Sequence, residues 1–139
     1  MHQAILDVYS GSVQAAVAAQ RAGDRDHPDL AKYFGGNTPA LFDVQEGIDR
    51  HDTRGTFYEG ELQVVTAKVT EFDPDAEPPT ASIEACLDDT DYRLVNREDG
   101  SAVPDTESGG RYTATSTAST GPDGRWYIVQ SVANWDDPC

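Results

Sequence analysis

The sequence changes from helical to strand-like patterning soon after its fiftieth residue, and this order limits the folds open to the chain. Apolar residues recur at helical spacing over 3–22, among good helix formers. A short helix follows Pro28, and Pro39 opens a third helix that ends near Arg50. The segment 3–50 is therefore predicted to form three helices.

The rest of the chain has the pattern of antiparallel strands. The predicted strands cover 56–72, 81–87 with a possible continuation through 92–95, and a hairpin of 111–120 and 125–135 around Gly121-Pro122-Asp123-Gly124. The polar, glycine-rich stretch 99–110 is predicted to be a mobile loop. Helices followed by antiparallel strands predict one α+β domain over 1–139, with helices at 3–50 packed on a curved sheet at 56–135.

Two cysteines constrain this arrangement further. Cys86 ends the strand-like run 81–87, and Cys139 is the last residue. Two cysteines so placed predict one structural disulfide, which indicates an oxidising compartment. A cytosolic protein with two free thiols is the alternative. The N-terminus lacks the layout of a secretion signal, and no apolar run is long enough to cross a bilayer. If the disulfide forms, we expect a leader to have been removed from the precursor.

The net charge of the chain limits the classes of partner that it can bind. The sequence carries 25 acidic and 10 basic residues, a formal net charge of −15. Such a chain repels phosphate backbones and anionic lipid headgroups, so nucleic acid is not an expected partner. A chain of 139 residues is large enough to bury a core of its own.

Several segments carry a resemblance to a known fold. They are the helix with Tyr9, the link from Gly23 to Leu30 that leads to Tyr33, the strand ending Cys86-Leu87-Asp88-Asp89-Thr90-Asp91, and the closing Gly124-Arg125-Trp126 hairpin with Cys139. In this order they resemble the nuclear transport factor 2-like superfamily, a cone-shaped, cystatin-like α+β fold. Through these segments the chain is similar to small secreted actinobacterial envelope lipoproteins of this fold. The resemblance implies that Cys86 pairs with Cys139, and that a lipidated cysteine upstream tethers the precursor to the membrane.

Catalysis in such a cone needs an ionisable group in the pocket, and the sequence offers three candidates. Asp49 and His51 could form a base and its orienter, but two residues apart on a helix they diverge by about 200°. A solvated helix end, with His51 favoured by the helix dipole, is the preferred interpretation. Glu84 enters the cone only if Ile83, Ala85 and Leu87 do not, and the preferred interpretation places Glu84 on the wetted convex side.

The candidate residues for ligand binding and for metal binding each have a structural alternative. Four tyrosines could line a pocket, although core packing is their commoner role: Tyr9, Tyr33, Tyr58 and Tyr92. A disulfide would bring together five carboxylates that could bind calcium: Asp88, Asp89, Asp91, Asp136 and Asp137. A solvated acidic rim is favoured over such a metal site. With both cysteines in a disulfide, only scattered histidines remain for zinc. No cofactor motif is present, so no cofactor is expected.

These observations favour a secreted domain, or one on the outer face of the cell membrane, that binds a small molecule or a protein without catalysis. One alternative is a small-molecule isomerase or hydrolase that uses the cone pocket. Another is a protein that dimerises through its open sheet face, which exposed Trp126, Ile128 and Val132 would mark. The sequence leaves open whether the protein is a monomer or a homodimer.

Overall fold

The computed structural model describes residues 2–104 and 110–139. Three helices come first: α1 (Gln3–Ala22), α2 (Leu30–Tyr33) and α3 (Pro39–Arg54). Helix α1 ends at Gly23, whose left-handed backbone (φ 64°) closes the last turn. At the start of α3 the Thr38 hydroxyl accepts the Leu41 N–H, and Pro39 occupies the first turn. Helix α3 runs one turn beyond the predicted end at Arg50, to the left-handed Gly55.

Six strands follow among the described residues, and they form two sheets. The strands are β1 (Thr56–Gly60), β2 (Gln63–Asp73), β3 (Thr80–Asp88), β4 (Tyr92–Asn96), β5 (Arg111–Thr120) and β6 (Trp126–Asn134). The larger sheet has the order β2-β3-β5-β6, and β1 pairs with β4 in the smaller one; every strand pair is antiparallel. The hairpin of β5 and β6 confirms the pairing predicted around Gly121-Pro122-Asp123-Gly124.

The segment 56–72 differs from the prediction because it is two strands in two different sheets. The chain turns at Gly60, which has a φ of 99° that only glycine adopts easily. Similarly, 92–95 does not continue β3 but belongs to β4, which pairs with β1. The segment 105–109 of the predicted mobile loop lies outside the described residues. Before it, the Ser101 carbonyl accepts the Asn96 N–H at 2.8 Å, so the start of this loop is held to β4.

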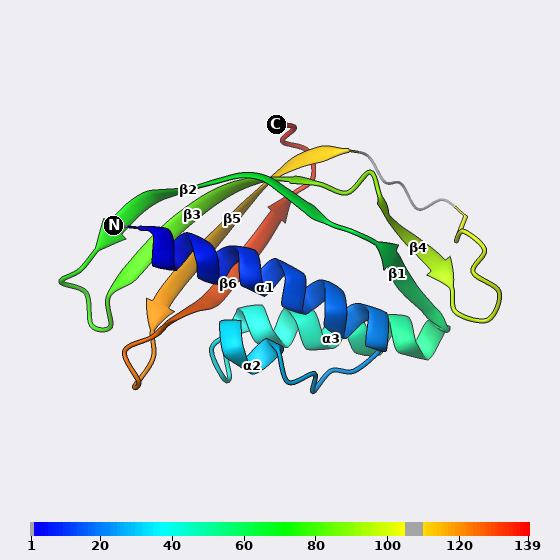
Figure 1. The fold of residues 1–139 in the computed structure, drawn as a ribbon, viewed down its shortest axis with the longest axis horizontal. Helices are drawn as coiled ribbons and strands as arrows, with labels where there is room; N and C mark the ends of the chain where they lie inside the picture. Colours follow the sequence, from blue (N-terminus) through cyan, green and yellow to red (C-terminus); the bar gives the residue numbers. More distant parts are fainter. Residues whose placement is uncertain (1, 105–109) are drawn as a thin grey trace.

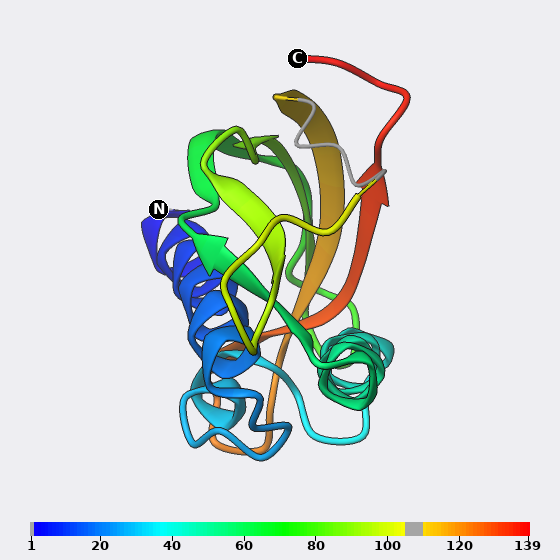
Figure 2. The same ribbon diagram turned by 90° about the vertical axis from the view of Figure 1, so that its right-hand side faces the viewer.

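The helices lie on one face of the curved larger sheet (Figures 1 and 2). Breaks in register within β2 and between β5 and β6 mark bulges, which increase the local twist and bend of a sheet. The two layers enclose a core to which α1 contributes Ile5 and Tyr9, and α3 contributes Ile48. The predicted α+β fold, with N-terminal helices on a curved antiparallel sheet, is confirmed.

Strand β3 shows which face of the sheet is buried. Ala81, Ile83, Ala85 and Leu87 are all buried on the concave side, whereas Glu84 between them is exposed. Opposite them on β5 lie Ala118 and Ala114. The many alanines leave space between sheet and helices that larger side chains would fill.

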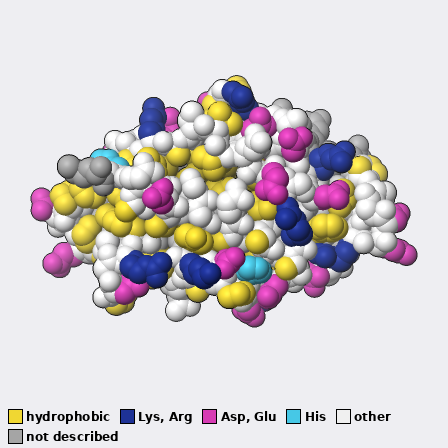
Figure 3. All heavy atoms as spheres, viewed as in Figure 1, with side chains coloured by type: hydrophobic (Ala, Val, Ile, Leu, Met, Phe, Trp, Pro, Cys, Tyr) yellow, Lys and Arg dark blue, Asp and Glu magenta, His cyan; other side chains and the backbone are white. Residues whose placement is uncertain are grey.

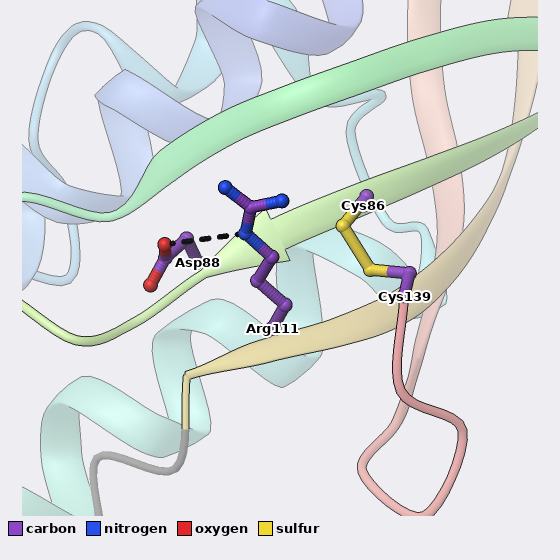
Figure 4. The surroundings of a disulfide bond; sticks show 4 residues. All are labelled: Cys86, Asp88, Arg111 and Cys139. Atoms are coloured by element: carbon purple, nitrogen blue, oxygen red, sulfur yellow. Dashed lines mark ion pairs between the residues drawn. A yellow bond between two sulfur atoms is a disulfide. The ribbon is translucent and has the colours of Figure 1, made fainter.

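The predicted disulfide is present between Cys86 and Cys139, with the Cα atoms 5.9 Å apart (Figure 4). It ties the C-terminal tail back across β5, where the Thr113 N–H also donates to the Asp137 carbonyl at 2.8 Å. None of the helices among the described residues is long and apolar enough to span a membrane.

Candidate functional site

A cavity of about 370 Å³ lies between the helices and the concave face of the larger sheet, and we call it the concave cavity. This volume lies in the range of small-molecule sites, roughly 300–1,000 Å³. Its lining is mainly apolar. The residues come from every layer of the fold: Tyr9, Ser12, Val13, Ala16, Val17, Phe34, Ala40, Asp43, Val44, Leu62, Leu87, Tyr92, Ala114, Ser116, Ser131, Val132, Ala133 and Trp135.

Tyr9 brings a polar atom to the cavity wall from the middle of α1. The residue is only 3% exposed, and burial raises its pKa to about 12. Within residues 2–104 and 110–139, its hydroxyl has no hydrogen-bond partner. In the same residues, no side-chain polar atom that is sealed from solvent lacks a partner. Solvent therefore reaches the Tyr9 hydroxyl, and because Tyr9 lines the cavity, a ligand there can bond to it.

A pair of hydroxyls lies on the sheet side of the cavity. Ser116 of β5 and Ser131 of β6 face each other across the strand pair, and their Oγ atoms are 2.7 Å apart. Each hydroxyl can still accept a further hydrogen bond. The floor of the cavity therefore offers a polar contact within an apolar surface.

The cavity opens to solvent at a rim formed by α3 and the end of β6. Asp43, Val132, Ala133 and Trp135 are all exposed and all contribute to the lining. Trp135 is 65% exposed, and its ring packs on Tyr112 with the centroids 4.2 Å apart. The rim thus combines an aromatic side chain with a carboxylate.

Of the four tyrosine candidates, Tyr9 and Tyr92 line the cavity. Burial is the main cause that raises the pKa of Tyr92. Tyr58 stacks on Tyr92, with centroids 4.6 Å apart and 12° between the planes, and so supports the wall from behind. Tyr33 packs beside Gly11, where a Cβ atom would collide with its ring. Tyr58 and Tyr33 therefore contribute to packing rather than to the lining.

Asp49 and His51, the candidate acid–base pair that the sequence pattern did not favour, do not contact each other in the described structure. Asp49 accepts a hydrogen bond from Arg25 at 2.7 Å, on the outside of α3. His51 is half-buried beside the Thr56 hydroxyl, at 3.2 Å, and its ring meets Tyr58 edge-on. Burial, with Arg50 and Arg54 nearby, lowers the pKa of His51. Helix α3 ends at Arg54, so His51 lies in its last turn, as the preferred interpretation of this segment expects.

Glu84 lies outside the cavity. It is exposed on the convex side of β3 and faces Lys68 of β2, with the charged atoms 3.6 Å apart. The preferred interpretation of the strand pattern thus holds, and Glu84 is not placed to act on a ligand in the cone.

The five predicted acidic metal candidates are dispersed or already hydrogen-bonded. Asp88 accepts from the Thr90 N–H and hydroxyl and lies 3.6 Å from Arg111 (Figure 4). Asp89 is the one buried carboxylate in the described parts of the chain, and it accepts the Gly110 N–H at 2.9 Å. Within those parts, no three His, Cys, Asp or Glu side chains are grouped to hold a metal ion.

A second hollow of about 630 Å³ lies outside the cone, between the α2–α3 link and the β5–β6 turn. Its single ionisable carboxylate, Asp123, already accepts hydrogen bonds from the Tyr127 hydroxyl and the Arg125 N–H. This hollow therefore offers a ligand fewer unused polar groups than the concave cavity does.

Sequence reasoning missed Asp43 and Trp135 as site residues. A signal for Asp43 exists, because it lies three residues after Ala40 and four before Gly47, both on the buried face of α3. A polar residue in an apolar helical stripe is a candidate for a cavity rim. Trp135 follows the last strand and has no such pattern.

The helices and the curved antiparallel sheet define an α+β fold with a cavity between its two layers. No family model matches the sequence, and no curated protein sequence matches it. Among solved structures, the chain is similar to the intermembrane space region of the chloroplast protein ARC6, with a TM-score of 0.60 and 12% identity over 96% of this chain and 95% of that one.

Two bacterial structures are also similar. A protein from Catenulispora acidiphila, solved in complex with S-DNPA, has a TM-score of 0.53 and 12% identity over 96% of this chain and 93% of that one. A ketosteroid isomerase-like protein from Erwinia carotovora atroseptica SCRI1043 has a TM-score of 0.45 and 12% identity, covering 89% of each chain. At 12% identity, the likenesses to ARC6 and to the Catenulispora acidiphila protein show the fold alone.

Proposed function

We propose that this protein is a secreted or cell-surface binding module that holds a small, largely apolar ligand in the concave cavity without catalysing a reaction. The observation that carries the proposal is the lining of that cavity. It is apolar on most sides, it presents the unbonded Tyr9 hydroxyl, and it contains no histidine or buried carboxylate among the described residues. Such a lining favours retention of a ligand over proton transfer to it.

An extracellular location is supported by the disulfide. We include in this proposal the lipid-anchored precursor that the resemblance to actinobacterial envelope lipoproteins implies. The Catenulispora acidiphila structure in complex with S-DNPA indicates that a protein of this fold can hold a ligand.

The sheet-dimer alternative has little support from the proposed marker residues. Ile128 is fully buried and Trp126 is half-buried, so only Val132 is exposed. The enzyme alternative has no buried acid in the cavity among the described residues, because Asp89 is held by Gly110 and lies outside the lining, and the lining carboxylate Asp43 is exposed at the rim.

The test is fluorescence titration with N-phenyl-1-naphthylamine, an uncharged probe that brightens in apolar surroundings. Two neighbouring residues of β5 provide a matched pair of variants. Ala114 faces the cavity, whereas Thr115 faces the convex side. Ala114→Phe fills the cavity and is expected to weaken probe binding at least about tenfold, while Thr115→Phe leaves it within about twofold. Equal binding by both variants, each verified as folded by circular dichroism, would place the probe elsewhere and refute the proposed site.

A further inference from the structure

The concave cavity has an unusual balance of charge. Of the side chains that line it, only that of Asp43 is charged at neutral pH; no lysine, arginine or histidine is among them. In the described parts of the chain Asp43 has neither an ion pair nor a hydrogen-bonding side-chain partner. A carboxylate at the mouth of an apolar cavity is therefore available to a ligand of opposite charge.

Aromatic side chains form much of the remaining wall. Tyr9, Phe34, Tyr92 and Trp135 line the cavity from four separate segments. Aromatic rings carry negative charge density on their faces, and they attract cations that lie within about 6 Å of the ring centre. Among these side chains, the indole of Trp135 attracts cations most strongly. It packs on Tyr112 yet keeps most of its surface accessible.

The C-terminal tail holds Trp135 in place. On one side, Asn134 is paired with Thr113 in the sheet. On the other, Asp137 accepts the Thr113 N–H, and Cys139 is bonded to Cys86 (Figure 4). Trp135 lies between these two anchors, so its ring is positioned before a ligand arrives, which lowers the entropic cost of binding.

The charge of the whole protein also favours a cationic ligand. Its formal net charge is −15, and acidic side chains are spread over the face seen in Figure 3. A protein of this charge concentrates cations near its surface and repels anions. An anionic ligand would be repelled by both the overall charge of the protein and the Asp43 carboxylate.

We propose that the concave cavity selects a small organic cation with an apolar body, whose charged end lies at the rim with Asp43 and Trp135 while the body enters the cone. This inference rests on the proposed binding function and names the class of its ligand. The Asp43 carboxylate supplies the counter-charge, and the indole of Trp135 supplies the aromatic face.

The test compares phenyltrimethylammonium with tert-butylbenzene, an uncharged molecule of the same shape, as competitors of N-phenyl-1-naphthylamine. Asp43→Asn removes the rim charge, and Glu46→Gln is its control, because Glu46 is also exposed on α3 but does not line the cavity. We expect Asp43→Asn to weaken phenyltrimethylammonium about three- to tenfold and to leave tert-butylbenzene within about twofold, whereas Glu46→Gln changes neither. Trp135→Leu is expected to weaken the cation more than the uncharged compound.

The outcomes distinguish a failure of this inference from a failure of the binding function on which it rests. If the parent protein binds tert-butylbenzene and the probe but not phenyltrimethylammonium, the cavity binds ligands and the cation inference is wrong. If Asp43→Asn and Glu46→Gln weaken the cation equally, only the overall charge matters and the assigned role of Asp43 is overturned. If the parent binds neither the probe nor either competitor, the binding function and the ligand class both fail.

Discussion

Trp135 packs on Tyr112 with ring centroids 4.2 Å apart and 41° between the ring planes. Tyr112 belongs to β5 and is buried, whereas Trp135 lies in the tail that follows β6. The contact makes the tail a part of the cavity rim. Because the tail ends in the disulfide to Cys86, a covalent bond on the convex side stabilises a wall of the cavity on the concave side.

Removing the disulfide should lower stability strongly. The bond closes a loop with a sequence separation of 53 residues. In the chain-entropy model, a loop of this length stabilises the folded state by roughly 4 kcal/mol. We expect Cys86→Ser/Cys139→Ser to lose up to this free energy of unfolding, measured by urea titration. Reduced and alkylated parent protein should show a similar loss, and a double variant as stable as the parent would contradict the role.

Gly60 is expected to tolerate no side chain. Its φ is 99°, and a Cβ atom would collide with the carbonyl oxygen of Asp91. Gly60→Ala should therefore lower the free energy of unfolding by more than about 2 kcal/mol. Gly36→Ala is the matched control, since a Cβ atom there has open space, and it should change stability by less than about 1 kcal/mol. Similar thermal melting of the two variants would disprove the strain at Gly60.

The buried tyrosines should make the fold sensitive to alkali. Burial raises the pKa of Tyr9 to about 12 and also raises those of Tyr92 and Tyr112. A raised pKa in the folded state means that folding holds the phenol proton more tightly. The associated stability is complete below about pH 10, the unfolded value, and is lost as the pH rises toward 12.

Absorbance at 295 nm provides the measurement. Part of the tyrosine signal should titrate near the ordinary pKa, and the rest should appear only at higher pH or on unfolding. Tyr9→Phe removes one such group, so its stability should fall less than that of the parent between pH 9 and pH 11. A single titration phase for all tyrosines would show that these side chains are accessible.

His51 should produce a loss of stability on the acid side. Its pKa is lowered, mainly by burial, so the unfolded chain takes up a proton more readily than the folded protein. The stability from neutral His51 is complete above about pH 6.5 and is lost as the pH falls below that value. His51→Asn should therefore lose less stability than the parent between pH 7.5 and pH 5.5. Equal losses, measured by urea titration at both values, would count against burial as the cause.

Glu84 is expected to have little effect on either stability or binding. Its ion pair with Lys68 is exposed, with 3.6 Å between the charged atoms. Exposed pairs of this kind contribute less than about 1 kcal/mol. Glu84→Gln should melt close to the parent and bind N-phenyl-1-naphthylamine with the same affinity. A large loss of binding would mean that this strand face takes part in the site.

The strongest patterns in the sequence led to correct elements. The 3.6-residue spacing in α1, the Thr38-Pro39 start of α3 and the turn before Arg125 are local signals that specify local structure. The division of 56–72 at Gly60 was missed because β-branched residues continue on both sides of the break. Only the positive φ of Gly60 shows that the chain turns there, and a glycine in a sequence does not reveal its φ.

The candidate site was foreseen in part. All four tyrosines were considered for the cavity, with core packing as the preferred role; Tyr9 and Tyr92 line the cavity, while Tyr33 and Tyr58 pack behind it. Asp49 and His51 were considered because they are close in sequence, but their side chains meet Arg25 and Thr56 instead. Such contacts join segments far apart in the chain or around a turn, and no local pattern encodes them.

The sequence alone determined the α+β class, the acidic character and the pairing of the two cysteines, because periodicity, net charge and residue number are properties of the chain itself. The tertiary structure alone decided which residues form the cavity. Asp43 and Trp135 meet the same space only because α3 and the tail after β6 pack against one sheet. A site of this kind depends on where the curved sheet places separate segments, and curvature arises from the packing of the whole domain.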